Sequence, residues 1–278
     1  MNRTLLQIKV LYETMGKSEK RIADWLFEHS GEIIPLSITE LAEKSSSSEA
    51  TIVRFAKRLG FSGYQELKIS FAQESGKKLI NDDISRDDTC ADIFEKISND
   101  IYCSLEMTKN AIDPKNLEKA AKAILDANTI SIFGLGNSAA VATDAAHKFL
   151  RAGCRATAYS DNHMQAIAAS HLTDKDVAIG ISHSGSSKDI VDALAISKRN
   201  GATTICITNF GKSPIIKQSG IVLCTRSKET EYSILGLNSR IAALAIIDAI
   251  YTYIICKSGE RAENAARRAE KALQSKKY

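Results

Sequence analysis

Hydrophobic and polar positions follow two different patterns in two parts of this chain. Up to about residue 77, apolar residues recur every three or four positions, as they do on helices that bury one face. From about residue 128, short apolar runs alternate with segments of helical spacing. This second order is typical of parallel strands that are joined by helices. The pattern therefore predicts an all-α N-terminal domain followed by an α/β domain.

Five segments of the second part have the apolar character of buried strands, and they are residues 129–133, 155–159, 176–182, 203–209 and 221–225. A long helix from about Tyr232 to Cys256 is expected to close this part. We therefore predict a five-stranded parallel sheet that is flanked by helices. Ligands of such folds bind at the carboxyl ends of the strands.

A polar stretch rich in Asp and Lys, residues 75–90, separates the two patterns and indicates a linker. We expect a helical domain over residues 1–77, a linker over 78–92 and a second domain over 93–278. The sheet core of the second domain is expected at about 128–256.

The composition is that of soluble globular material, with 44% hydrophobic and 25% charged residues. The longest apolar stretch, from Ile241 to Cys256, contains Asp248 and is shorter than the roughly 20 residues that span a bilayer. Because the N-terminus also lacks a signal-peptide core, we expect a cytoplasmic protein without a membrane partner. The six cysteines form no CxxC pair, and no His or carboxylate group has metal-ligand spacing, so neither a metal nor a cofactor is expected.

The net charge of +4 does not by itself indicate nucleic-acid binding. Residues 257–278 carry seven Lys or Arg and three Glu, which accounts for the whole excess. Residues 1–77 are nearly neutral, with eleven Lys or Arg and ten Asp or Glu. DNA binding by this domain would therefore depend on where individual cations lie.

Residues 37–60 have the pattern of a helix, a tight turn and a second helix, for which Ser48 is a suitable N-cap. In a helix-turn-helix, the N-terminal end of the second helix meets base edges in the major groove. Arg54 could bind a guanine and Thr51 a thymine methyl or a phosphate. Cations further along could hold phosphates. The residues expected at DNA are Ser48, Thr51, Arg54, Lys57, Arg58 and Lys68. The alternative is a helical domain whose charges are merely solvated.

Two glycine- and serine-rich turns follow predicted strands, GLGNSA at 134–139 and SHSGSS at 182–187. Glycines let the backbone approach a ligand closely, and the free N–H groups of the following helix favour an anion. Serine hydroxyls can bond phosphate or sugar oxygens. The expected contacts of a small phosphorylated ligand are Gly136, Ser138, Ser182, His183, Ser184, Gly185 and Ser187.

The first turn also fits the loose GxGxxA dinucleotide fingerprint, which is a weak signal alone. Asp161, after the second predicted strand, could then hold a ribose. This alternative leaves the second serine turn unexplained.

The two signatures together resemble the RpiR-type bacterial transcriptional regulators. SEATIVRFAKRLGFSGYQELK at 48–68 is similar to their helix-turn-helix pattern SxATxxRFxKxLGFxGYxELK. Their C-terminal part is a SIS (sugar isomerase) domain. Four segments are similar to the hallmarks of this domain. They are FGLGNSA at 133–139, DAAHKFLRAG at 144–153, SHSGSSKD at 182–189 and the segment at 229–251.

The resemblance implies a regulator of sugar metabolism that binds double-stranded operator DNA as a homodimer or homotetramer. It implies a phosphorylated sugar or amino sugar as effector, with the phosphate held by Ser138, Ser182, Ser184 and Ser187. It adds Glu229 as a contact of the sugar hydroxyls. The alternative from another class is a sugar-phosphate isomerase, which would need a base. Glu229, His163 and His183 are the candidates.

Overall fold

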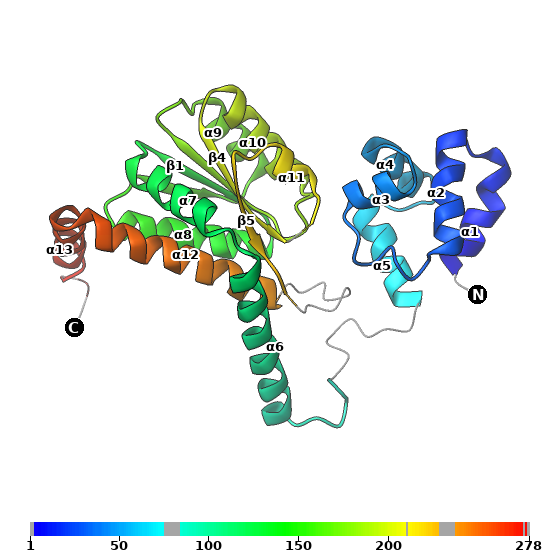
Figure 1. Ribbon diagram of the computed structural model, residues 1–278, viewed down its shortest axis with the longest axis horizontal. Helices are drawn as coiled ribbons and strands as arrows, with labels where there is room; N and C mark the ends of the chain where they lie inside the picture. Colours follow the sequence, from blue (N-terminus) through cyan, green and yellow to red (C-terminus); the bar gives the residue numbers. More distant parts are fainter. Residues whose placement is uncertain (1–2, 75–83, 210, 228–236, 275, 277–278) are drawn as a thin grey trace. The chain divides into compact units, whose positions relative to one another are not determined.

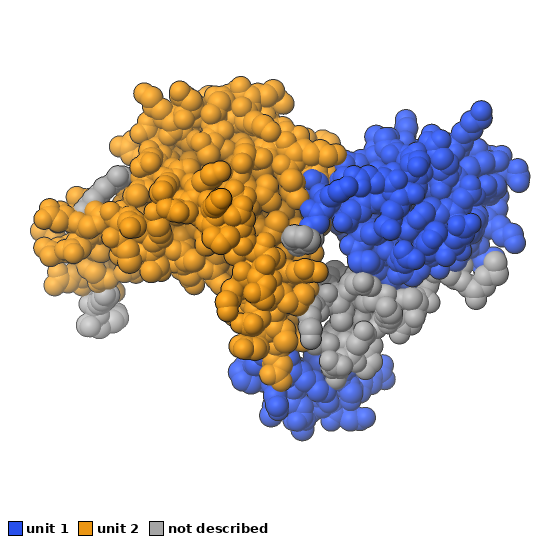
Figure 2. Space-filling model, viewed as in Figure 1, with its two compact units in different colours: residues 1–98, 211–213, 229–235 blue, residues 99–210, 214–228, 236–278 orange. Residues whose placement is uncertain are grey.

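The computed structural model describes residues 3–74, 84–209, 211–227, 237–274 and 276. It divides into two compact units (Figure 2), which are residues 1–98, 211–213 and 229–235, and residues 99–210, 214–228 and 236–278. The first unit is helical and the second contains the sheet (Figure 1).

The helical unit buries one face of each of its amphipathic helices in a common core. Its elements are α1 (Arg3–Leu11), the 3-10 helix η1 (Tyr12–Thr14), α2 (Lys17–Glu28), α3 (Ile38–Lys44), α4 (Glu49–Arg58) and α5 (Tyr64–Glu74). The largest fully buried side chains include Leu41 of α3, Phe55 of α4 and Phe71 of α5. The predicted all-α N-terminal domain is therefore confirmed.

The α/β unit contains the predicted five-stranded parallel sheet. Helix α6 (Cys90–Ala111) begins in the first unit and belongs to the second from Asn99 onward. The elements that follow it are α7 (Pro114–Asp126), β1 (Ile130–Gly134), α8 (Asn137–Arg151), β2 (Ala156–Tyr159), α9 (Asn162–Ser170), β3 (Val177–Ile181), α10 (Lys188–Arg199), β4 (Thr203–Asn209), α11 (Pro214–Lys217), β5 (Ile221–Thr225), α12 (Leu237–Ser258) and α13 (Glu260–Gln274). The strand order is β2-β1-β3-β4-β5, with every pair parallel. The chain therefore reverses its winding direction between β1 and β3, where such folds bind ligands.

Helices cover both faces of the sheet (Figure 1). Helices α7, α8 and α12 lie on one face and pack on a core that includes Ile132, Ile179 and Ile207. Helices α9, α10 and α11 lie on the other face, over Phe133 and Cys206. Because successive strand residues point to opposite faces, strands buried on both sides have the continuous apolar runs seen in the sequence.

Two helices differ from the sequence expectation. The sequence pattern did not indicate α9, because its outward face carries the exposed apolar residues Met164 and Ile167 rather than polar ones. Helix α6 begins within the predicted linker. There, the Thr89 hydroxyl accepts a hydrogen bond from the Asp92 N–H (3.2 Å), and the Asp92 carboxylate accepts one from the Thr89 N–H (2.8 Å). These polar residues cap a helix and do not form a linker.

By length and composition alone, one helix of the described residues could cross a membrane, namely Asn238–Ser258 within α12. In the structure, Ile246, Ile247, Ile250 and Ile254 of this helix are buried in the core below the sheet. This packing agrees with the expectation of a core helix. Helix α12 is described from Leu237, so Tyr232 lies outside the described residues.

A glycine at the end of β1 sets the position of α8. A Cβ atom added to Gly134 would lie 2.5 Å from the backbone oxygen of Ser138, in the first turn of α8. No real Cβ contact is so short, so only glycine permits this approach. The absence of a side chain therefore lets the start of α8 lie directly against the carboxyl edge of the sheet.

We expect Gly134→Ala to lower the free energy of unfolding by about 1–3 kcal/mol, because the first turn of α8 must move away from β1. Gly220→Ala is a matched control, because the nearest atom to its added Cβ is the Thr204 oxygen at 3.6 Å, an ordinary contact. Urea unfolding of the three proteins gives the comparison. Equal stabilities of both variants would show that α8 can shift without cost.

Candidate functional site

Helices α3 and α4 form the predicted helix-turn-helix, and hydrogen bonds determine its geometry. The turn contains Ser46 in the left-handed region (φ +47°), and the Ser47 N–H donates to the Ala42 carbonyl (2.8 Å). The Thr39 hydroxyl of α3 donates to the Glu49 carboxylate of α4 (2.8 Å). These bonds fix the direction in which α4 leaves the turn.

The start of α4 confirms one structural expectation and corrects another. Ser48 is the N-cap, since its hydroxyl accepts a hydrogen bond from the Thr51 N–H (3.2 Å). Thr51 was expected on the outward face, but its side chain is buried. Its hydroxyl lies 2.8 Å from the Ser48 hydroxyl and accepts a bond from Arg54 Nη2 (3.3 Å). Thr51 is thus placed to orient Arg54.

The outward face of α4 is formed by Ala50, Arg54 and Lys57, which are all exposed. Their spacing of four and then three residues puts them on one side of a helix. The small Ala50 leaves the N-terminal end of this face open, and two cations follow it. This face is what a helix-turn-helix presents to the major groove.

Two of the cations expected at DNA are engaged within the helical unit. Arg58 donates from Nη1 to the Glu19 carboxylate (2.7 Å) and from Nη2 to the Thr14 carbonyl (2.7 Å). Lys68 Nζ donates to the Leu36 carbonyl (2.9 Å). These bonds connect separate elements, so both side chains contribute to the fold of the unit.

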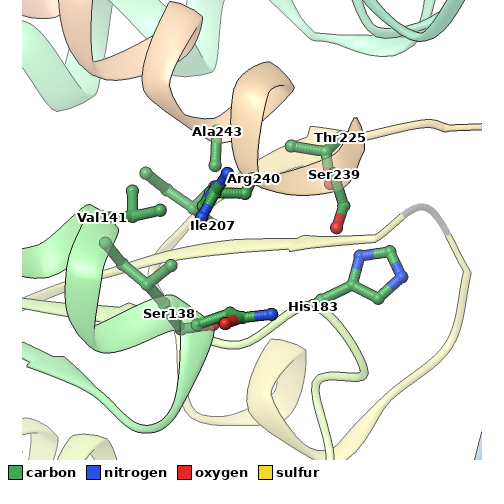
Figure 3. Close-up of a pocket in the computed structure, with 10 residues that line it drawn as sticks. Ser138, Val141, His183, Ile207, Thr225, Ser239, Arg240 and Ala243 are labelled. Carbon is green, nitrogen blue, oxygen red and sulfur yellow. The ribbon is translucent and has the colours of Figure 1, made fainter. Parts of the chain in front are cut away.

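A small pocket opens at the carboxyl edge of the sheet (Figure 3). Its walls come from the first turns of α8 and α12, the ends of β3, β4 and β5, and the turn after β3. The lining residues are Asn137, Ser138, Val141, Ile181, His183, Ile207, Thr225, Ser239, Arg240 and Ala243. Apolar side chains form one part of the wall, and hydroxyl, amide, imidazole and guanidinium groups form the rest.

The structure brings only part of the predicted ligand set to this pocket. Ser138 and His183 line it. Ser182 is buried, and its hydroxyl donates to the Ser187 hydroxyl (3.1 Å) at the start of α10. The Ser184 hydroxyl accepts a bond from the Ser186 N–H (3.3 Å). These two bonds hold the serine turn in shape.

The two predicted glycines adopt conformations that favour glycine. Gly136, the N-cap residue of α8, has φ +55°, and Gly185 in the serine turn has φ +62°. The Gly185 carbonyl accepts a bond from the Ile215 N–H (3.0 Å), which ties the turn to α11. Glu229, the remaining predicted contact, lies outside the described residues.

Backbone bonds fix the position of His183 at the pocket. Its carbonyl accepts hydrogen bonds from the Asn209 N–H (3.0 Å) and the Thr208 hydroxyl (3.4 Å) at the end of β4. The turn after β3 is therefore anchored to the neighbouring strand, and the imidazole faces the pocket (Figure 3).

Sequence reasoning missed four polar residues of the pocket, Asn137, Thr225, Ser239 and Arg240. Thr225 ends a strand and Asn137 begins a helix, so both follow from the rule that ligands bind at this edge. Ser239 and Arg240 lie in the first turn of the long apolar α12. An arginine at the start of an otherwise apolar helix was the available signal.

The electrostatics of the pocket favour an anion. The first turns of α8 and α12 both line it, and the aligned peptide dipoles of a helix give its N-terminal end a partial positive charge. Of the described residues that line it, Arg240 is the one with a full charge, and none is Asp or Glu.

The dinucleotide-binding and isomerase alternatives depend on Asp161 and on a catalytic base, respectively. The Asp161 carboxylate caps α9 by accepting from the Met164 N–H (2.9 Å), so the acid that a dinucleotide site would need is engaged. Among the isomerase candidates, His183 lines the pocket, whereas His163 is exposed at the start of α9. Within the described part of the chain, no cluster of three or more His, Cys, Asp or Glu could hold a metal ion.

Comparison with protein families gives two matches. The family described as "Helix-turn-helix domain, rpiR family" matches residues 2–78, and the SIS domain family matches residues 123–253. The first match contains α3 and α4, and the second contains the sheet and every residue that lines the pocket.

Named relatives match over nearly the whole chain. An uncharacterised HTH-type transcriptional regulator of Caldanaerobacter subterraneus is 38% identical over 92% of this chain and 92% of its own length. The transcriptional regulator HexR of Pseudomonas aeruginosa is 30% identical over 100% of this chain and 98% of its own length. The regulator RpiR of Escherichia coli K12 is 30% identical over 89% of this chain and 84% of its own length.

Solved structures confirm the fold. The NanR protein of Vibrio vulnificus, solved in complex with ManNAc-6P, superposes with a TM-score of 0.82 at 23% identity, covering 99% of both chains. The sugar isomerase domain of an RpiR transcription factor from Sphaerobacter thermophilus superposes with a TM-score of 0.58 at 24% identity. It covers 64% of this chain and 98% of its own.

We expect Arg58→Ala to lower the free energy of unfolding by about 0.5–1.5 kcal/mol, because the bonds to Glu19 and Thr14 connect α4 to the start of the unit. Lys57→Ala is the matched control on the exposed face of the same helix. Thermal unfolding followed by circular dichroism measures both. Equal melting temperatures for the two variants would contradict a structural role for Arg58.

Proposed function

Because this chain belongs to the rpiR family of helix-turn-helix transcriptional regulators, we propose that a phosphorylated sugar or amino sugar controls its affinity for operator DNA. The single observation that carries the proposal is the combination of an exposed basic face on α4 with an anion-favouring pocket in the SIS domain. The first suits a DNA groove and the second a small charged metabolite.

The exposed face of α4 is the part that reads DNA in this proposal. Arg54 has the geometry to bind a guanine in the major groove, and Lys57 holds a phosphate one turn further along. Ser48 and Thr51 then act at the N-terminal end of α4, where Thr51 orients Arg54 through its hydroxyl. Arg58 and Lys68 are hydrogen-bonded within the helical unit, so they contribute less to DNA binding than Arg54 and Lys57 do.

The chemistry of the pocket supports a phosphorylated sugar. Hydroxyl and amide groups of Ser138, Asn137, Thr225 and Ser239 match the hydroxyls of a sugar, and the apolar residues match its C–H faces. NanR, which shares the fold, was solved with ManNAc-6P, a phosphorylated amino sugar. In the serine turn after β3, Ser184 and Ser187 add neutral hydroxyl donors for a phosphate, and Ser182 supports them by donating to the Ser187 hydroxyl.

The proposed switch requires two copies of the chain. A dimer reads a palindrome when its two recognition helices lie about 34 Å apart, one turn of DNA. A ligand shifts an equilibrium only if it binds one arrangement of the dimer more tightly than the other. We propose a homodimer or homotetramer in the cytoplasm, whose effector changes this spacing.

The first experiment is capture of genomic DNA fragments by the purified protein at moderate salt, followed by sequencing. We expect a few palindromic sites, and their neighbouring genes then nominate the sugar to test. Diffuse retention that disappears as salt is raised would mean that α4 is not a specific reader. The isomerase alternative predicts turnover of hexose or amino-sugar phosphates that is lost in Glu229→Gln.

We expect Arg54→Ala to weaken binding to the operator by about 1–3 kcal/mol and to relax the choice of base at one position. Lys57→Ala serves as the comparison, because loss of a phosphate contact weakens binding to all sequences and reduces its salt dependence by about one charge. Binding to operator variants at several salt concentrations separates the two effects. An unchanged base preference in Arg54→Ala would remove Arg54 from the base contacts.

We expect Ser138→Ala to raise the phosphosugar concentration needed for half of the operator response by roughly tenfold, because a hydroxyl bonded to a charged group is lost. Ser170→Ala, an exposed serine at the end of α9, is the matched control. Each response is scaled to the variant's own operator binding without ligand. A normal response in Ser138→Ala would locate the effector elsewhere.

A further inference from the structure

Arg240 is a cation whose position in the pocket has no structural explanation among the described residues. It lies in the first turn of α12, is partly buried, and lines the pocket together with Ser239 and Ala243 (Figure 3). The structure gives its guanidinium no hydrogen bond or ion pair with another described residue. By contrast, Arg58 and Arg151 each pair with a carboxylate.

An unpaired and partly buried guanidinium is costly, because removal from water weakens its hydration without replacing it. Such a group is retained where a ligand supplies the missing anion. No Asp or Glu occurs among the described residues that line the pocket, so these residues cannot neutralise Arg240. The helix starts of α8 and α12 add positive charge and do not compensate it.

We infer that Arg240 forms the charged contact with an oxyanion of the effector. This inference rests on the proposed function and adds a residue that lies outside both glycine- and serine-rich turns, within the segment 229–251. The planar guanidinium presents two parallel N–H donors, which match the two oxygens of a phosphate or a carboxylate. Neutral donors from Ser138 and Asn137 line the wall formed by α8, so the effector is bound between α8 and α12.

Two groups of a phosphorylated sugar could supply the oxyanion, namely the phosphate or, in a sugar acid, the carboxylate. Glucose 6-phosphate and 6-phosphogluconate carry the same phosphate and differ at C1, which is a carboxylate in the second only. Gluconate carries the carboxylate without the phosphate. N-acetylmannosamine 6-phosphate tests an amino sugar with the same charge as glucose 6-phosphate.

The test is calorimetric titration of the full chain with these four compounds, using the wild type, Arg240→Met, Arg240→Lys and Arg199→Met. Arg199 is the matched control, because it is exposed at the C-terminal end of α10 and away from the pocket. We expect Arg240→Met to weaken binding of the tightest phosphorylated compound by roughly tenfold or more, and Arg240→Lys by less. Arg199→Met should bind as the wild type does.

The pattern of losses identifies the oxyanion. An equal loss for glucose 6-phosphate and 6-phosphogluconate assigns the phosphate to Arg240, whereas a loss confined to 6-phosphogluconate and gluconate assigns the carboxylate. Unchanged affinity in Arg240→Met, with a wild type that binds, overturns the inference and leaves the proposed function intact. A wild type that binds none of the phosphorylated compounds contradicts the proposed function itself.

Salt dependence of the wild type provides a measurement that does not require a variant to fold. Pairing of Arg240 with an oxyanion predicts that affinity falls as ionic strength rises, because salt screens the attraction. A salt-independent affinity would contradict the inference even if Arg240→Met were unstable. Arg240→Lys gives a second check, since it keeps the charge and loses the paired donors.

Discussion

The contact between Gly134 and the first turn of α8 governs the geometry of the carboxyl edge of the sheet. A side chain at this position would meet the Ser138 backbone, so glycine alone allows α8 to begin directly above the end of β1. This close approach brings Asn137 and Ser138 level with the ends of β3, β4 and β5. The pocket exists because these elements end at the same edge, where the strand order also reverses.

The serine turn after β3 is also held in position by contacts within the fold. Its hydroxyls bond partly to one another, and its backbone bonds to β4 and α11. A turn held in this way presents His183 to the pocket in one position. Preorganisation of this kind lowers the entropy that a ligand must overcome on binding. Several serines of the motif therefore support the pocket wall, while Ser138 lies on its surface.

Helix α4 shows a related division of roles in the helical unit. Residues of its inner face, such as Ile52 and Phe55, join the core, and Thr51 orients Arg54 from a buried position. Ala50, Arg54 and Lys57 form the outward face, whereas Arg58, also exposed, is bonded to Glu19 and Thr14. The hydrogen bond between Thr39 and Glu49 connects α3 to the start of α4 and so holds the exposed face of α4 in one direction.

Sequence alone determined the elements whose signals are local. The parallel strands were predicted because residues buried on both faces of a sheet form continuous apolar runs. The helix-turn-helix and its Ser48 cap were predicted because capping and helical periodicity involve only near neighbours. The α9 helix was not indicated, because apolar residues on its outward face conceal the helical period.

Tertiary structure decided which residues share a site. Arg240 lies more than a hundred residues after Ser138, and only the packing of α12 beside α8 brings both to one pocket. It also decided that the Thr51 side chain is buried. It decided that Arg58 and Lys68 bond within their unit, because their partners, Glu19 and the Leu36 carbonyl, lie far away in the sequence. Local patterns specify secondary structure because its hydrogen bonds are short in sequence. A binding site depends on contacts between distant segments, which no local pattern contains.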